Sequence, residues 1–260
     1  MSKLVIDDVT RTFPGVNGGP PTQALLPTSL AIADNDFITI LGPSGCGKST
    51  LLRIVAGLDR PTTGRVLLDG QPVTGPGAER GMVFQSYTLF PWLTVRQNVC
   101  FGLRERGMST KQQDEVAAHW LAKVGLETFA HHYPKMLSGG MQQRTAIARA
   151  LANDPKILLL DEPFGALDNQ TRGLMQELLL TIWEAERKTV LFVTHDIEES
   201  IFMASRVLVM SARPGRFKAE VAVPIPHPRH YTVKTTPEFS ALKAQLTEEI
   251  RVEALKVATA

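Results

Sequence analysis

The sequence of 260 residues lacks several features that would assign it to common protein classes. Its two cysteines, Cys46 and Cys100, are too few and too far apart for a disulfide framework or a cysteine metal site, which suits a reducing cytosol. Its 28 basic and 26 acidic residues nearly cancel, and it has no basic tract of five or more residues, so nucleic acid is disfavoured as a partner. No apolar run approaches the roughly 20 residues that cross a bilayer, and no apolar signal segment follows Met1. We therefore expect a soluble protein that reaches a membrane only through a partner.

The strongest positive signal is a glycine-rich turn between an apolar strand pattern at 38–41 and a helical apolar pattern at 51–55. Such a loop cradles nucleoside triphosphates, because its glycines let N–H groups face inward and the helix N-terminus favours anions. We expect Lys48 to reach the β- and γ-phosphates and the Ser49 hydroxyl to ligand Mg²⁺. A chance glycine turn is disfavoured by the complete G-x-x-x-x-G-K-S string. The predicted lining residues are Gly42, Pro43, Ser44, Gly45, Cys46, Gly47, Lys48, Ser49 and Thr50.

Two further apolar runs end in polar residues that we expect at the same sheet edge. Residues 157–160 are typical of a strand buried on both faces, and Asp161 and Glu162 follow them. Asp161 could join the Mg²⁺ shell, and Glu162 could act as general base on the attacking water. The run 189–194 delivers His195, which could hydrogen-bond the γ-phosphate or the water. The plain alternatives, a strand end turning into solvent and a lone surface histidine, lose weight beside a phosphate loop.

Three other stretches allow two interpretations each. Residues 138–140, a serine and two glycines that open a helix, predict either a second anion site or a plain N-cap. Phe13 is either a core residue or a stacking platform for adenine. The loop 86–93 is rich in large apolar residues, which either cap the domain's own core or form a patch for a partner.

The remaining segments predict strands around a helical insertion. Residues 4–13 have a strand pattern, and the Gly- and Pro-rich segment 15–21 predicts a hairpin or flexible loop. Thr94 and Thr110 are each followed three residues later by Gln, which predicts two helix starts with capping boxes. Apolar residues at helical spacing in 239–250 predict a final helix that packs on its own domain.

Taken together, the motifs resemble those of the ATP-binding-cassette ATPases over residues 3–212. In the family's order they are Walker A at 42–50, the Q-loop at Gln85, the signature at 137–142, Walker B at 157–161 with Glu162, the D-loop at 166–168 and the switch histidine His195. One departure is Met141, where many members carry Gln. Function should persist, because only Ser138 and backbone N–H groups need to face the phosphate.

This resemblance implies roles that the residues alone do not. Phe13 would stack on adenine, Gln85 would join the metal site and link it to a membrane partner, and two protomers would sandwich two ATP molecules. Ser138 and Gly140 would contact the nucleotide held by the opposite protomer. The implied catalytic residues are Glu162, His195, Gln85 and Lys48, the metal ligands are Ser49, Gln85 and Asp161, and Gly139 and Asp168 complete the nucleotide-binding set.

The implied fold is an α/β P-loop NTPase cassette with a mainly parallel core sheet, an N-terminal antiparallel β region and an inserted helical subdomain. We expect the nucleotide-binding core at 1–93 and 141–212, the helical subdomain at 94–140 and a short C-terminal extension at 213–260.

Residues 90–95, 213–216 and 226–229 look like the ATPase subunits of nitrate, sulfonate and taurine importers. This likeness implies a homodimeric, Mg²⁺-dependent ATPase on the cytoplasmic face of the cell (inner) membrane. It would bind an integral membrane permease and, through it, serve an extracytoplasmic solute-binding protein. The alternative is a soluble ATPase of the family that acts on ribosomes or DNA, usually with two cassettes or a coiled coil. One cassette and no heptad run favour the importer, and a nucleotide kinase would not explain residues 138–140 or His195.

Overall fold

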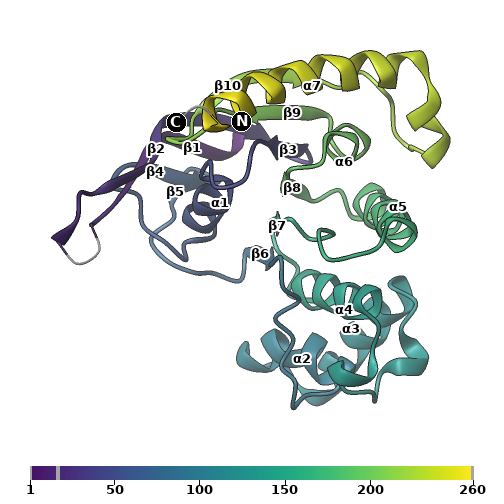
Figure 1. The fold of residues 1–260 in the computed structure, drawn as a ribbon. Coiled ribbons are helices and arrows are strands. Elements are labelled where there is room, and N and C mark those ends of the chain that lie inside the picture. Colours follow the sequence, from purple (N-terminus) through teal and green to yellow (C-terminus); the bar gives the residue numbers. More distant parts are fainter. Residues whose placement is uncertain (1, 16–17, 259–260) are drawn as a thin grey trace. The chain divides into compact units, whose positions relative to one another are not determined.

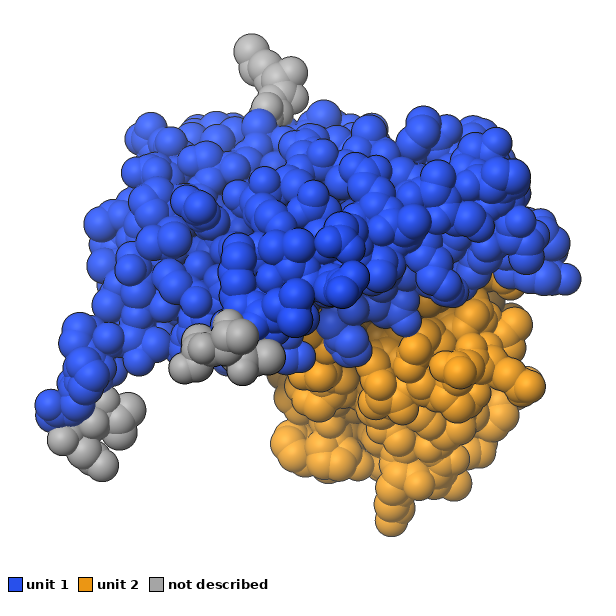
Figure 2. Space-filling view, turned by 45° about the horizontal axis from the view of Figure 1, so that its top comes forward, with its two compact units in different colours: residues 1–77, 189–260 blue, residues 78–188 orange. Residues whose placement is uncertain are grey.

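The computed structural model describes residues 2–15 and 18–258. Residues 16 and 17 of the predicted loop at 15–21, and Met1, lie outside the described residues. The chain forms two compact units, a first unit of residues 1–77 and 189–260 and a second unit of residues 78–188 (Figure 2). Within the described ranges no helix combines the length and apolarity needed to cross a bilayer.

The first unit begins with an antiparallel sheet in the strand order β2-β1-β4-β5. Its strands are β1 (Ser2–Phe13), β2 (Thr22–Ala33), β4 (Thr63–Leu68) and β5 (Gln71–Pro72). Burial alternates along the second half of β2, as expected of a strand with one face on the core. The predicted N-terminal antiparallel region is confirmed.

The same unit contains the strand order β10-β9-β3-β8. These strands are β3 (Phe37–Leu41), β8 (Thr189–Thr194), β9 (Arg206–Met210) and the antiparallel edge strand β10 (Phe217–Ala222). β3 runs parallel to β8 and β9, and every residue of β3 and β8 is buried. Continuous apolar runs therefore form two-sided buried strands, as the sequence predicts.

The first unit also contains the helical segments α1 (Lys48–Ala56), α6 (Ile197–Met203), η4 (Tyr231–Thr235) and α7 (Pro237–Ala258). α7 packs on α6 and β9 and runs alongside β9 and β10 in Figure 1. Phe239 and Leu246 of α7 are fully buried, while Leu242 and Ile250 are half-buried. The predicted packing face of the last helix is confirmed.

The second unit pairs two parallel strands, β6 (Arg80–Val83) and β7 (Ile157–Asp161), and is otherwise helical. Its helical segments are α2 (Val95–Glu105), α3 (Thr110–Lys123), η2 (Glu127–Phe129), η3 (Pro134–Met136), α4 (Gly139–Ala152) and α5 (Asn169–Glu186). The predicted helical insertion between the Q-loop and the signature is thus present.

One of the two predicted helix starts is wrong by a residue. Thr94 caps α2 with the predicted capping box. At α3, however, Ser109 is the N-cap, its box partner is Gln112, and Thr110 is already helical. The side chain of Gln113 donates instead to the Met108 carbonyl, at 2.7 Å, so it is not available to a cap at Thr110.

Candidate functional site

The phosphate loop lies in the first unit, between β3 and α1. Its last residue, Gly47, is the N-cap of α1 and has φ 106°, a left-handed conformation that side chains rarely adopt. A Cβ on Gly47 would lie 2.7 Å from Leu25 Cδ2 and 3.0 Å from the Ala24 carbonyl oxygen. Backbone conformation and packing therefore both require glycine where the loop enters the helix.

Lys48 is only 4% exposed although it carries a charge. Its Nζ donates to the carbonyl oxygens of Gly42 and Pro43, at 2.8 and 2.9 Å. These bonds satisfy the buried ammonium and hold its charge on the loop, at the positive end of the α1 dipole. The Lys48 ammonium and the α1 dipole therefore both favour an anion at the place where the sequence predicts phosphates.

His195 is brought to the same edge of the sheet. Leu41 of β3 and Thr194 of β8 are register partners, so Gly42 and His195 each follow directly after one of them. The side chain of His195 is exposed. The first unit therefore places a solvent-facing imidazole beside the start of the phosphate loop, as predicted.

Phe13 lies at the end of β1 and is half-buried. The guanidinium carbon of Arg11 lies 4.4 Å from its ring centroid, and Arg11 is itself held by Asp59 at 2.9 Å and by the Arg60 carbonyl at 2.8 Å. One ring face is thus taken by a cation–π contact. An adenine base would have to stack on the other face.

Cys46 points into the protein, with 1% of its surface exposed. A Cβ built on Gly42 would lie 3.0 Å from its Sγ. The thiol therefore packs as a small apolar residue, and only the backbone of Cys46 can face a nucleotide.

The carboxylates lie in the second unit, at the end of β7. Asp161 is the last strand residue and is buried, while Glu162 follows it with φ 44°. Such a backbone costs about 1–3 kcal/mol in a non-glycine residue, and strain of this kind clusters at functional sites. Gln85 Nε2 lies 3.5 Å from Glu162 Oε2, a long hydrogen bond that brings the predicted Q-loop residue to the predicted base.

The N-terminus of α4 carries the residues of the predicted second anion site. The Ser138 hydroxyl accepts from the Met141 N–H at 3.3 Å, so Ser138 does act as an N-cap. A Cβ on Gly139 would lie 2.8 Å from Tyr87 Oη, and one on Gly140 would lie 2.7 Å from Thr171 Cγ2. Glycine therefore lets Tyr87 and Thr171 approach the start of this helix closely.

Asp168 has a structural role that the motif match did not predict. Its carboxylate caps α5 by accepting from the N–H groups of Thr171 and Gln170, at 3.0 and 3.1 Å. These bonds, that of Thr171 first, lower the pKa of Asp168 below its ordinary value. The predicted D-loop residue thus stays ionised and fixes the first turn of α5.

The three predicted metal ligands are divided between the units. Ser49 belongs to the first unit, whereas Gln85 and Asp161 belong to the second. A hydroxyl, an amide oxygen and a carboxylate are hard oxygen donors of the kind that Mg²⁺ takes together with substrate phosphates, so the residue types fit that ion.

Comparison with known proteins now decides the family. A family model described as ABC transporter matches residues 25–165, more than half of the chain. The chain belongs to the ABC transporter family. The nitrate import ATP-binding protein NrtD of Synechocystis is 49% identical over 254 residues, covering 95% of this chain and 95% of that protein. The aliphatic sulfonates import ATP-binding protein SsuB of Bacillus cereus is 43% identical over 244 residues, covering 94% of both.

A solved ABC structure supports the same assignment. This ATP-binding cassette, a dimer in a post-hydrolysis state bound to ADP and Pi, is 36% identical and superposes with a TM-score of 0.75. The match covers 86% of this chain and 100% of that chain. The α/β cassette fold expected from the motifs is confirmed.

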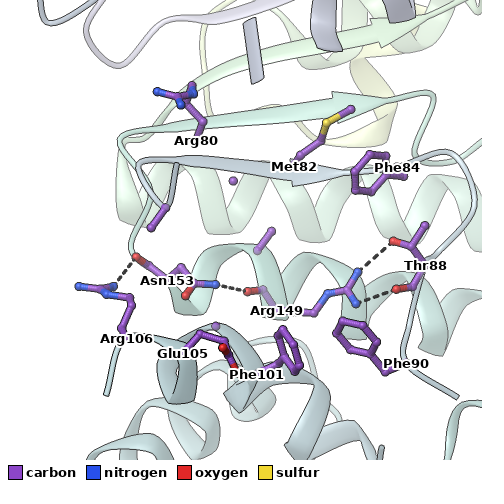
Figure 3. A pocket seen from close by; sticks show the side chains of 14 residues that line it. Arg80, Met82, Phe84, Thr88, Phe90, Phe101, Glu105, Arg106, Arg149 and Asn153 are labelled. Carbon is purple, nitrogen blue, oxygen red and sulfur yellow. Dashed lines mark hydrogen bonds between the residues drawn. The ribbon is translucent and has the colours of Figure 1, made fainter. Parts of the chain in front are cut away.

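The second unit of this ABC cassette also contains a pocket of about 610 Å³, which the sequence did not predict (Figure 3). In the apolar loop 86–93, the ring of Phe90 packs against that of Phe101 in a tilted arrangement, with ring centroids 4.3 Å apart. Trp92, by contrast, is 69% exposed. Phe90 of this loop therefore packs on the core of its own unit, whereas Trp92 is exposed to solvent.

Arg149 of α4 holds this pocket together. Its guanidinium donates to the Tyr87 carbonyl at 3.2 Å. It also donates to the carbonyl and the hydroxyl of Thr88, at 2.8 and 3.0 Å (Figure 3). Burial lowers the pKa of Arg149, and the three acceptors compensate the buried charge. No local pattern marks Arg149, because its acceptors are about sixty positions earlier in the chain.

Proposed function

We propose that this protein is the ATP-hydrolysing subunit of an ABC importer, which drives uptake of a small solute through a separate membrane permease. The observation that carries this proposal is the phosphate loop, with a left-handed Gly47, a helix N-terminus and the buried charge of Lys48. The relatives named for nitrate and sulfonate import support a small anionic solute such as nitrate, an alkanesulfonate or taurine.

ATP binding follows from the loop geometry. The phosphates accept hydrogen bonds from backbone N–H groups of residues 42–50, and Lys48 exchanges its two carbonyl acceptors for phosphate oxygens. Phe13 stacks on the adenine with the ring face that Arg11 leaves uncovered. Ser49, Gln85 and Asp161 would hold Mg²⁺, which would supply positive charge to neutralise the phosphates.

Hydrolysis requires a base and a water molecule in line with the γ-phosphate. Glu162 takes a proton from this water, whose oxygen forms a bond to the γ-phosphorus while the bond to the β-γ bridging oxygen breaks, leaving ADP and phosphate. Gln85 orients the Glu162 carboxylate through its long hydrogen bond. The imidazole of His195 hydrogen-bonds the γ-phosphate.

The working form is a homodimer, as in the solved ABC cassette dimer. In this form Ser138, Gly139 and Gly140 contact the nucleotide of the opposite protomer, with the α4 N-terminus directed at its phosphate, and Asp168 completes that contact. Both the α4 N-terminus and the capping carboxylate at α5 are already formed in the single chain.

The pocket behind Arg149 supports a permease as the partner. Its walls include Met82, Phe84, Phe90 and Phe101, so it suits an apolar side chain on a short segment of the permease. A subunit docked in this way would lie peripherally on the cytoplasmic face of the membrane. The solute-binding protein would act from the other side, through the permease.

The decisive experiment is reconstitution of this subunit with its permease in proteoliposomes, with ATP inside and binding protein with nitrate, taurine or an alkanesulfonate outside. We expect one solute to stimulate ATP hydrolysis and to enter the vesicles. Glu162→Gln, which keeps the shape of the side chain but not the base, should bind ATP and lose about 10²–10⁴-fold in hydrolysis rate. Stimulation by ribosomes or DNA, with no association with a permease, would favour the soluble alternative.

A further inference from the structure

The turn that follows β9 contains residues 213–216, to which the proposed mechanism gives no role. At its centre, Gly215 forms an isolated parallel bridge to Leu25 of β2. The Gly215 N–H donates to the Ala24 carbonyl and its own carbonyl accepts from the Leu26 N–H, both at 2.9 Å. The C-terminal extension is thus hydrogen-bonded to β2 immediately beside the residues that pack on Gly47.

Gly215 is also pressed against the phosphate loop itself. A Cβ at this position would lie 1.9 Å from the carbonyl oxygen of Cys46 and 2.7 Å from Met210 Cε. Gly215 lies outside the left-handed φ region, so the requirement for glycine is one of space. Met210, the last residue of β9, also packs against the loop, since its Cβ lies 3.1 Å from a Cβ built on Gly42.

The other end of the turn is held by α7. The Ala212 N–H donates to Glu253 Oε2 at 2.8 Å, and the second carboxylate oxygen accepts from Lys256 at 2.7 Å and Lys218 at 3.2 Å. Glu253 is 1% exposed, although it lies near the end of a largely exposed helix. Ser211 closes the turn by donating its N–H to the Arg216 carbonyl at 2.9 Å.

We propose that Gly215 and Glu253 are positioning residues for ATP binding, through which α7 holds the 211–216 turn against the back of the phosphate loop. The contact chain runs from Glu253 to Ala212, through the turn to Gly215, and from there to the Cys46 carbonyl. Any partner that lifts α7 would therefore loosen the phosphate loop without touching the nucleotide. The inference rests on the proposed function only in taking ATP as the ligand of the loop.

The test compares ATP binding with folding in purified full-length variants. Gly215→Ala forces the Cys46 carbonyl to move, so a fluorescent ATP analogue should bind about tenfold or more weakly, since misplacements near 1 Å have large effects in preorganised sites. Glu253→Ala should raise the KM for ATP several-fold, and Glu253→Gln, which keeps an oxygen acceptor for the Ala212 N–H, should have a smaller effect. Circular dichroism and the nucleotide-free Tm report folding separately.

Two matched variants control for the substitutions themselves. Gly75→Ala adds a methyl group where no neighbouring atom lies within 4 Å, and Glu248→Gln removes an exposed carboxylate from the same helix as Glu253. Both should bind ATP like the wild type. If folded Gly215→Ala and Glu253→Ala bind ATP within twofold of the wild type, the inference is wrong, even when their Tm falls.

Lys48→Ala separates this inference from the proposed function. If Lys48→Ala loses ATP binding while the Gly215 and Glu253 variants keep it, only the positioning role fails. If the wild type itself does not bind ATP, the proposed function fails.

Discussion

Two helices begin at glycine-rich segments that the sequence assigns to anions, and their N-termini are built differently. At α1 the N-cap is Gly47, which has no side chain, and the neighbouring charge is the buried ammonium of Lys48. At α4 the N-cap is Ser138, whose hydroxyl already accepts one of the first N–H groups of the helix. The α1 end is therefore shaped to give its N–H groups to a ligand, whereas the α4 end partly satisfies itself.

The glycines around the two ends differ in the same way. Gly47 faces backbone and a core leucine in a left-handed conformation, so neither neighbour can give way easily. Gly139 and Gly140 face the ends of the side chains of Tyr87 and Thr171, which can rotate. The phosphate loop is a fixed backbone shape, and the α4 end is an ordinary cap with small residues for close approach.

The largest expected effect is at Lys48. Lys48→Ala removes a charge-assisted donor, and such bonds contribute about 1.5–3 kcal/mol, so ATP should bind about 10- to 100-fold more weakly. Ser138→Ala should change the ATP affinity of the isolated chain little, because Ser138 is proposed to act on the nucleotide of the other protomer. Isothermal titration of both variants tests the contrast, and equal losses would contradict it.

The second largest effect is a difference in stability between substitutions of Gly47 and Gly139. Gly47→Ala should destabilise the fold by about 1–3 kcal/mol through overlap with Leu25, with further strain from its φ. Gly139→Ala should destabilise the fold less, because its methyl group meets only the end of the Tyr87 side chain, which can move. Denaturant unfolding measures both, and a more destabilising Gly139→Ala would overturn the ranking.

A smaller effect distinguishes the two roles of Ser138. Ser138→Ala removes the cap of α4 and should cost about 1 kcal/mol of stability. Ser138→Asp keeps a good N-cap and should restore this stability, but its negative charge would repel a phosphate at the helix end. ATP-dependent dimerisation of the Glu162→Gln protein should therefore fail with Ser138→Asp and be only weakened by Ser138→Ala. Dimerisation of both would mean that no phosphate meets this helix.

The smallest effect extends the comparison to a third helix end, that of α5. Hydrogen bonds from Thr171 and Gln170 lower the pKa of Asp168 in the folded state. The ionised carboxylate therefore contributes stability that is complete above the ordinary Asp pKa, about 3.9, and is lost as pH falls through the lowered value. The Tm advantage of the wild type over Asp168→Asn should be constant at neutral pH and vanish in acid. An advantage that grows in acid would contradict the sign.

Local signals in the sequence predicted most of the elements that carry the site. Continuous apolar runs predicted β3, β7 and β8, because a strand that is buried on both faces carries apolar side chains at successive positions. At α3, however, Ser109 and Thr110 are each followed three residues later by Gln, so two capping boxes overlap. In the structure Ser109 is the cap, and the side chain of Gln113 bonds to the Met108 carbonyl instead. The spacing of the residues does not predict this bond.

Long-range side-chain contacts could not be predicted from local sequence patterns either. Arg149 and Glu253 both look like exposed residues of amphipathic helices. In the structure Arg149 is half-buried and Glu253 is buried, and both bond to partners far away in the chain. The role of Gly215 depends on a carbonyl of Cys46, at a separation of well over a hundred residues. Local charge pattern, motif spacing and hydrophobic periodicity do not predict such pairs of residues.

The discontinuity of the first unit has a consequence for synthesis. β3 is made early, yet its two neighbours, β8 and β9, are made about 150 residues later, after the whole contiguous second unit. During translation the second unit can fold while the apolar strand β3 still has no neighbouring strands to pair with. Newly made chains should therefore be most prone to aggregate between the emergence of β3 and that of β9, which makes this interval the one where a chaperone has most to protect.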